Sequence, residues 1–356
     1  MKKWFNIAVL AVLVSLAACT KVENAPEVKE TISYTVGSYA QATKATTAFP
    51  TSLSFNSSAW LHDGGSAAGS VFYAAETISW DGATWAPSHD YYWPKNPESY
   101  INFVSWYDKN AAPGSANAPV VTENTITWSN RTFANDDDIF VADKAWKQTS
   151  NYDHKYYTPG IPTLFRHLLA QVEVRAKVKE ASETDATTGV TTSWSVTVKN
   201  FTINNVYTQG TLSLTNAIEP DADSDGLKIS AWTGNWDFEG CSTTTISGSS
   251  SQALNADDFE DILAMCSVIP QATAALTMSF QYEVTTVTSK SSSTHTVVET
   301  VDVPGLELSS FDGYIGDWDM NKKIIYSITI NAKTGVIAIN PTVDMWDTFS
   351  SEPMIE

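Results

Sequence analysis

Apolar and polar residues alternate in short runs along most of this chain, which is the pattern of strands with one buried face. Near the start, Ile32, Tyr34 and Val36 alternate with small polar residues, and this predicts a first strand. Only residues 255–263 have the pattern of helical turns. With the abundance of Thr, Ser and Val, these runs predict an all-β protein. Further strands are predicted at 53–55, 69–74, 91–93, 101–107, 138–141, 164–178, 192–203, 244–247, 262–269, 276–287, 295–303, 323–331 and 336–343, and within 204–214 the chain is expected to pass a turn at 209–210.

The predicted strands fall into two successive sets. A stretch rich in Asp and Ser at 219–226 separates them. Each set has about the seven strands that one β-sandwich needs, so the pattern predicts two sandwich domains in series, 32–217 and 218–356. Within the second set, residues 332–335 have the composition of a hairpin loop, with Gly335 placed for a positive φ.

The first residues predict export. Lys2 and Lys3 precede an apolar run, 5–16, that is too short to cross a bilayer comfortably as a helix. This is the pattern of a signal peptide at 1–18, followed by a polar tether at 19–31. The sequence Leu-Ala-Ala before Cys19 resembles the lipobox of bacterial lipoproteins. That resemblance implies cleavage before Cys19, acylation of its thiol with chains such as palmitate, and a membrane anchor. The alternative is an ordinary signal peptide with an incidental cysteine.

Net charge excludes some partners. Removal of 1–18 takes away two lysines and no acid, which leaves 19 basic against 40 acidic residues, a net charge of −21. Such a surface repels nucleic acid and anionic lipid, so neither is expected as a partner. Thirteen Trp, fourteen Tyr and fourteen Phe supply enough large side chains for sizeable cores.

Two cysteines follow Cys19 in the chain. An exported protein meets an oxidising compartment, so Cys241 and Cys266 could form a disulfide. However, Cys266 stands in the apolar run 262–269, where a buried free thiol is the commoner outcome. Both alternatives stay open, although the free thiol is favoured.

Acidic clusters do not have the pattern of a metal site. Residues 221–226 read Asp-x-Asp-x-Asp-Gly, like the first half of a calcium loop, but Trp232 stands where the bidentate glutamate belongs. Asp136, Asp137 and Asp138 are adjacent, and in an extended strand neighbouring side chains point to opposite faces. We therefore expect an acidic turn at 221–226, and neither a metal nor another cofactor.

No catalytic motif is found. The five histidines are far apart in sequence, and nucleophile elbow, P-loop and dinucleotide fingerprints are missing, so we expect no enzyme. His167 follows Phe165 in a predicted strand, which favours a packed, hydrogen-bonded histidine. The aromatic run 90–94 could form a sugar-binding platform, but alternating aromatics in a β-protein more often belong to the core.

A series of short elements, taken in order along the chain, resembles the signature of the fimbrillin family, the subunits of type V pili. The elements cover nearly the whole chain after Cys19, and the lipobox fits the same family. They are Tyr92-Trp93-Pro94, the aromatic strand 101–107, Asp138 with 139–142, the Phe165-x-His167 strand within 164–174, the Ile-Pro-Gln strand end at 268–271, Trp318, the strand 325–328 and the terminal 343–346.

The resemblance implies a fold and a route of maturation. The fold is two transthyretin-like β-sandwich domains, exported to the outer membrane as a lipoprotein. Maturation in the family removes the first strand on the cell surface, by a cut after a basic residue that is usually arginine. The first arginine of this chain is Arg131, deep in the predicted fold, and only Lys44 stands in the expected loop. Two alternatives stay open: a cut at Lys44 removes 32–44, or the chain remains an unprocessed anchor subunit.

The same resemblance implies assembly by strand exchange with other fimbrial subunits. Ile32, Tyr34 and Val36 would form the exchanged strand. The C-terminal segment 336–355 is the candidate donor, through Val336, Ile337, Ile339 and Val343, although both ends could also stay in their own sandwich. The expected function is a structural subunit, in a shaft, tip or accessory position, of a surface fimbria that supports cell adhesion. The alternative is a monomeric surface lipoprotein that binds glycan or host protein through its loops.

Overall fold

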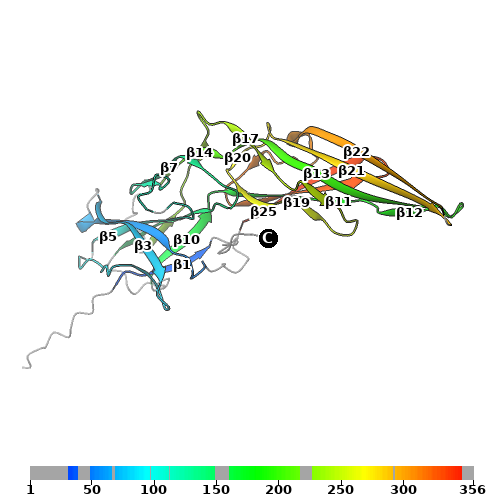
Figure 1. Cartoon of the computed structure of the whole chain (residues 1–356). Helices are drawn as coiled ribbons and strands as arrows, with labels where there is room; N and C mark the ends of the chain where they lie inside the picture. Colours follow the sequence, from blue (N-terminus) through cyan, green and yellow to red (C-terminus); the bar gives the residue numbers. More distant parts are fainter. Residues whose placement is uncertain are drawn as a thin grey trace, which may run out of the picture.

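The computed structural model describes residues 31–38, 49–65, 69–96, 98–111, 113–148, 160–216, 227–291 and 293–346. Within them the chain is all-β, as predicted, with two 3-10 turns as its only helices, η1 (Asp63–Gly65) and η2 (Leu308–Ser310). No helix of these segments is long and apolar enough to span a membrane. The molecule is elongated, with the early strands at one end and a long sheet at the other (Figure 1).

The early strands form a nine-stranded sheet that closes on itself. β5 pairs with β2 along one edge and with both β8 and β9 along the other, so seven strands make a ring and β9 and β15 extend from it. The order is β15 (Leu227–Ser230), β9 (Lys144–Gln148), β5 (Tyr100–Asp108), β2 (Phe55–His62), β3 (Ser70–Trp80), β4 (Trp85–Pro87), β1 (Tyr34–Ser38), β10 (Ile161–His167) and β8 (Ile139–Ala142).

β2, β5 and β8 are the part of this sheet that is buried on both faces. The inner face packs in a first core around Phe55, Phe103 and Phe165. The outer face, through residues such as Trp106, packs in a second core against Trp128 of a four-stranded sheet. That sheet consists of β16 (Trp236–Asp237), β14 (Gln209–Thr215), β7 (Thr125–Thr132) and β6 (Val120–Val121).

The other end of the molecule is a sandwich of two further sheets around a third core. β20 (Gln271–Ala272) and β23 (Asp317–Trp318) form a separate two-stranded sheet. One sheet contains β19 (Glu260–Val268), β11 (Ala170–Val178), β24 (Lys322–Asn331) and β25 (Val336–Met345). The other contains β12 (Ser182–Thr184), β13 (Thr191–Tyr207), β21 (Thr277–Lys290) and β22 (Ser293–Glu307), with β17 (Thr243–Ser247) and β18 (Ser251–Ala253) on the same edge of β13 as β12.

Sequence order does not separate the cores. β11 and β13 precede residue 217 but pack in the third core, whereas β15 and β16 follow residue 218 and pair with β9 and β14. Val172 belongs to the run 164–178 of the predicted first domain, yet it lies in the third core and not in the core of Phe103 and Phe165. The division into two folding units at 217/218 stays a prediction.

Three local predictions were wrong. Residues 91–93 form no strand, and Tyr92 makes only an isolated bridge with Thr31. The predicted strand 164–178 breaks at Leu168 and Leu169, which are buried in the second core while the chain crosses from β10 to β11. Residues 255–263 are not helical but lead into β19, because pairing with β11 outweighs a weak local preference. The hairpin at 332–335 is confirmed, with φ +70° at Gly335.

Candidate functional site

The first strand, β1, lies in the ring between β4 and β10. It runs parallel to β10 from Tyr34 opposite Ile161 to Ser38 opposite Phe165, and it meets β4 where Tyr34 faces Trp85. Ile32 and Tyr34 are 1% and 3% exposed, and Val36 packs against the same core. The three predicted side chains therefore point into the ring together, and β1 is the strand that closes it between β4 and β10.

Tyr34 is held by a buried polar network inside the ring. Its hydroxyl donates to Ser57 Oγ at 3.0 Å and also lies against the hydroxyl of Tyr73. Ser105 donates to the same Ser57 oxygen at 3.0 Å. Burial raises the pKa of both tyrosines well above the ordinary value, so the network consists of neutral hydroxyls. The ring of Tyr34 meets Phe55 edge to face at 5.6 Å, which fixes its orientation.

Two further residues adapt the ring to β1. Gly160 has φ +112°, and a Cβ there would lie 2.8 Å from the carbonyl carbon of Tyr34, so only glycine lets β10 start this close to β1. Phe49, which follows residues 39–48 in the sequence, is 2% exposed and contacts the rings of Phe55 and Phe165. Sequence reasoning missed Phe49, which stands beside Pro50 in a polar context and belongs to no strand.

The last strand, β25, is an outer strand of its sheet. It pairs with β24 over all ten residues, from Val336 opposite Asn331 to Met345 opposite Lys322. Of the four candidate donor residues, only Ile339 is buried, at 7% exposed, and Ile337 is half-buried. Val336 and Val343 are 60% and 47% exposed. Because side chains alternate, Val336 points to the opposite face from the other three, so the four do not form one apolar surface.

The residue after β25 ties it to the other end of the molecule. Trp346 is 4% exposed, and its ring stacks on His167 at the end of β10, with ring centres 3.7 Å apart. His167 Nδ1 lies 2.9 Å from a carboxylate oxygen of Asp138, just before β8. Burial raises the pKa of Asp138 above its ordinary value, even though His167 acts in the opposite direction. The predicted packed histidine is therefore one layer of a stack that holds the end of the last strand.

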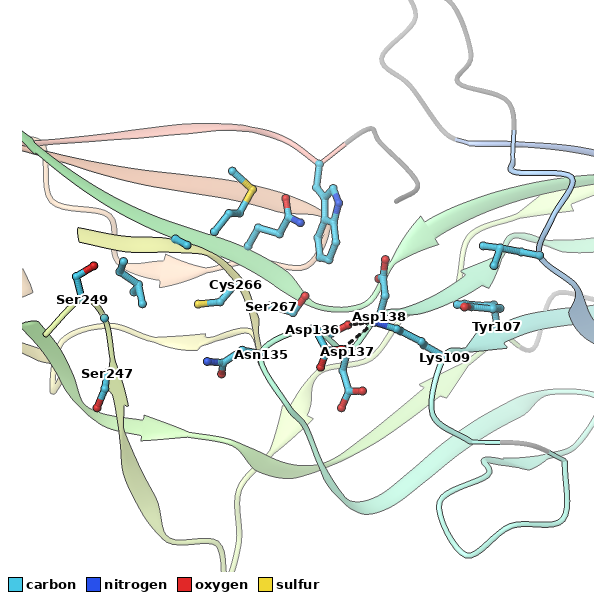
Figure 2. A pocket seen from close by; sticks show the side chains of 17 residues that line it. Tyr107, Lys109, Asn135, Asp136, Asp137, Asp138, Ser247, Ser249, Cys266 and Ser267 are labelled. Carbon is cyan, nitrogen blue, oxygen red and sulfur yellow. Dashed lines mark hydrogen bonds and ion pairs between the residues drawn. The ribbon is translucent and has the colours of Figure 1, made fainter. Parts of the chain in front are cut away.

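A hollow of about 450 Å³ lies beside this stack, between the ring and the sandwich (Figure 2). The three adjacent aspartates border it but have separate partners. Asp136 accepts from Lys109 at 2.9 Å, which lowers its pKa, and Asp137 accepts from the backbone N–H of Ala134 at 2.8 Å. Asp138 faces His167, so the three carboxylates do not converge. No group of three His, Cys, Asp or Glu suited to a metal ion exists among the described residues.

The remaining candidates are dispersed. Cys241 is half-exposed and Cys266 is buried, and both are free thiols; burial raises the pKa of Cys266 to about 12. Of the aromatic run 90–94, Tyr91 and Trp93 pack against the first core as expected, and Tyr92 is 38% exposed.

Several predictions lie outside the described residues. They are the signal peptide 1–18 and Cys19, most of the tether 19–31, Lys44 with its loop, the acidic turn 221–226, and the donor segment beyond Trp346.

Comparison with known proteins decides the family. A family model described as fimbrillin-like matches residues 42–346, which is most of the chain. The chain belongs to the fimbrillin-like family. The expected family resemblance is thus confirmed, and the family's description associates this fimbrillin-like chain with fimbriae.

Several solved structures align with most of this chain. A fimbrial protein from Bacteroides vulgatus has a TM-score of 0.50 at 17% identity, covering 89% of this chain and 99% of that one. A candidate cell adhesion protein from Bacteroides uniformis has a TM-score of 0.47 at 15% identity, covering 89% and 98%. The fimbrial anchor protein Mfa2 from Porphyromonas gingivalis has a TM-score of 0.32 at 8% identity, covering 89% and 97%. No curated protein sequence matches this fimbrillin-like chain.

Proposed function

We propose that this fimbrillin-like protein is a structural subunit, in a shaft, tip or accessory position, of a surface fimbria that assembles by strand exchange and supports adhesion. The observation that carries the proposal is the place of β1, because one short strand closes the ring and fills its core with Ile32 and Tyr34. A cut at Lys44 would leave β1 held by non-covalent contacts alone, while Phe49 stays with the fold.

Loss of β1 would open a specific groove. Full burial of a large apolar side chain is worth about 1.5–3 kcal/mol, so Ile32 and Tyr34 together contribute about 3–6 kcal/mol before their hydrogen bonds are counted. The edges of β4 and β10 would lose their backbone partners at the same time. A strand from a second copy that offers alternating apolar side chains would restore burial and pairing together.

The strand β25 fits the donor role by its shallow burial. Ile337, Ile339 and Val343 share one face, and an outer strand with one buried side chain costs less to release than a central one. Release also requires Trp346 to leave His167, which would make the stack a restraint on premature exchange.

Anchoring and processing are linked in this proposal. Cys19 precedes Lys44, so a cut at Lys44 would separate the acylated N-terminus from the fold and free the subunit for the fimbria. A chain that escapes the cut would stay in the outer membrane as an anchor. Cys19→Ser should abolish acylation and membrane partitioning in detergent phase separation, because the thioether needs the thiol.

The experiment is limited trypsin cleavage of the purified full chain. We expect one early cut at Lys44, followed by a ladder of oligomers on gels run under mild denaturation. Lys44→Ala should keep β1 covalently attached and the chain monomeric under the same treatment. The double variant Ile337→Asp and Val343→Asp, which removes the apolar face of the donor strand, should allow the cut but prevent growth. Nicked protein that loses β1 and remains monomeric at high concentration would contradict strand exchange.

That last outcome would favour the alternative, a monomeric surface lipoprotein that binds glycan or host protein. The exposed ring of Tyr92 is the feature in its favour, since exposed aromatic rings stack on sugars. Tyr91 and Trp93 pack inward, however, which leaves little of the run 90–94 for a platform.

A further inference from the structure

β22 is an outer strand, and both of its faces are exposed along its first ten residues. It pairs with β21 along one edge and with no other strand among the segments that the structure describes. Its first ten residues, from Ser293 to Asp302, are all exposed, and Val297 and Val298 are 41% and 56% exposed. Figure 1 shows β22 running along the long sheet, away from the ring. The backbone groups on its free edge form a template for another strand.

The polar side chains on one face of β22 are self-complementary. His295, Val297 and Glu299 alternate and so share one face. Two copies of an outer strand related by a two-fold axis run antiparallel, with the residue on the axis facing its own counterpart. When Val297 is on the axis, His295 of each copy lies opposite Glu299 of the other, which permits charge-assisted hydrogen bonds.

Neighbouring registers lack this match. An axis at Glu299 places two glutamates opposite each other, and an axis at Asp302 does the same with two aspartates; both are unfavourable. The Val297 register also places Thr294 opposite Thr300 and Thr296 opposite Val298, which are ordinary cross-strand partners in sheets. Pro304, which cannot donate to a ladder, lies beyond the paired stretch and limits it.

We propose that the free edge of β22 pairs with β22 of a second copy of this chain, antiparallel and centred on Val297. The pairing goes beyond strand exchange, because it uses a different sheet. β1 lies in the nine-stranded sheet and β25 pairs with β24, whereas β22 is the outer strand beside β21. Subunits could thus associate side by side without using the groove or the donor strand.

One strand pair of this length buries little surface, so a free pair of subunits associates weakly. In a fibre the same contact repeats along the length, and linked copies bind far more strongly than single ones. A covalent trap is therefore the appropriate test for the isolated full chain.

The trap is Val297→Cys. Directly opposed residues of antiparallel strands have Cα atoms about 4.5–5.5 Å apart, which is within the range of about 4.4–6.8 Å that a disulfide spans. We expect mild oxidation to give a disulfide-linked dimer, in about tenfold higher yield than from the control variant Val336→Cys. Val336 is an exposed valine on β25, an outer strand of a different sheet, and the native chain gives the background from its own cysteines. Equal yields from the two variants, or links only to other proteins, would overturn the proposal.

A charge swap tests the register. In the Val297→Cys background, His295→Glu places acids opposite each other and should reduce the yield about tenfold. Adding Glu299→His exchanges the two partners and should restore the yield. Failure of the swap to restore the dimer would overturn the Val297 register. All variants are exposed substitutions, so an unchanged midpoint of urea unfolding should verify that each chain is folded.

Discussion

β1 is half as long as β25, and it is the more deeply buried of the two. β1 lies between two neighbours, and its first residue Tyr34 is buried in the first core together with Ile32, which precedes the strand by two residues. β25 pairs over ten residues with β24, yet Ile339 is its only buried residue. The length of a strand therefore does not measure what it contributes to stability, because apolar burial, and not the number of ladder pairs, carries most of the free energy.

The comparison has a consequence for assembly. A strand that fills a core can be lost only at a large cost, so the opened subunit has a strong drive to capture a replacement. A strand that covers an edge can be given up at a small cost. Trp346 is the exception in the C-terminal segment, because its ring is buried in the core shared with the other end of the molecule.

The largest effect is expected from β1. Tyr34→Ala should lower the free energy of unfolding by about 3–5 kcal/mol, because it leaves a cavity and removes the hydroxyl that Ser57 and Tyr73 face. The control is Tyr92→Ala, because Tyr92 is 38% exposed; this substitution should change the free energy of unfolding by no more than about 0.5 kcal/mol. Urea unfolding measures both. A loss below about 1 kcal/mol at Tyr34 would remove the contrast between the strands.

Next is the stack that holds the end of β25. Trp346→Ala should cost about 3 kcal/mol, since the buried ring leaves a cavity beside His167. Hydrogen exchange should show faster opening of β25 amides, while the amides of β2 and β5 keep their protection. Trp80→Ala, at an exposed tryptophan, is the control. Unchanged exchange in β25 would mean that pairing with β24 alone holds the strand.

Within β25 the effects should follow burial. Ile339→Ala should cost about 2 kcal/mol, at the lower end for buried isoleucine, because the residue lies on an outer strand. Val343→Ala, at an exposed position, should stay within about 0.5 kcal/mol. Thermal or urea unfolding separates the two values. Equal losses at both positions would show that β25 is buried more evenly than its exposures indicate.

The smallest effect is pH-dependent. Burial raises the pKa of Asp138, so the folded chain takes up this proton at a higher pH than the unfolded chain. The contribution of Asp138 to the free energy of unfolding therefore decreases as pH rises from the pKa of Asp138 in the unfolded chain to its pKa in the folded chain. It increases again as pH is lowered through the same window. Asp138→Asn should remove this dependence, so the wild type should gain stability relative to the variant as pH is lowered through that window. Parallel unfolding curves for the two chains across the window would contradict the assignment.

Much of the local structure was accessible from periodicity. The alternation at 276–287 and 323–331 matches β21 and β24, and Gly335 marks the hairpin before β25. These predictions succeed because period-two alternation and a glycine with positive φ are properties of a few neighbouring residues.

The failures occur where distant residues compete with the local pattern. The run 164–178 reads as one strand, but Leu168 and Leu169 turn into the second core, and β10 and β11 join different sheets. Phe49 belongs to no periodic run, and its burial depends on rings from β2, β4 and β10.

The sequence by itself determined the all-β class, most strand positions and the family. Only the tertiary structure decided that β1 closes a ring, that Trp346 stacks on His167, and that β22 presents a free edge. The physical reason is that alternation specifies which face of a strand is apolar but not which partner covers it. The partner is selected by packing among residues far apart in the chain, as with Tyr34, whose hydroxyl meets Ser57 and Tyr73 from two other strands.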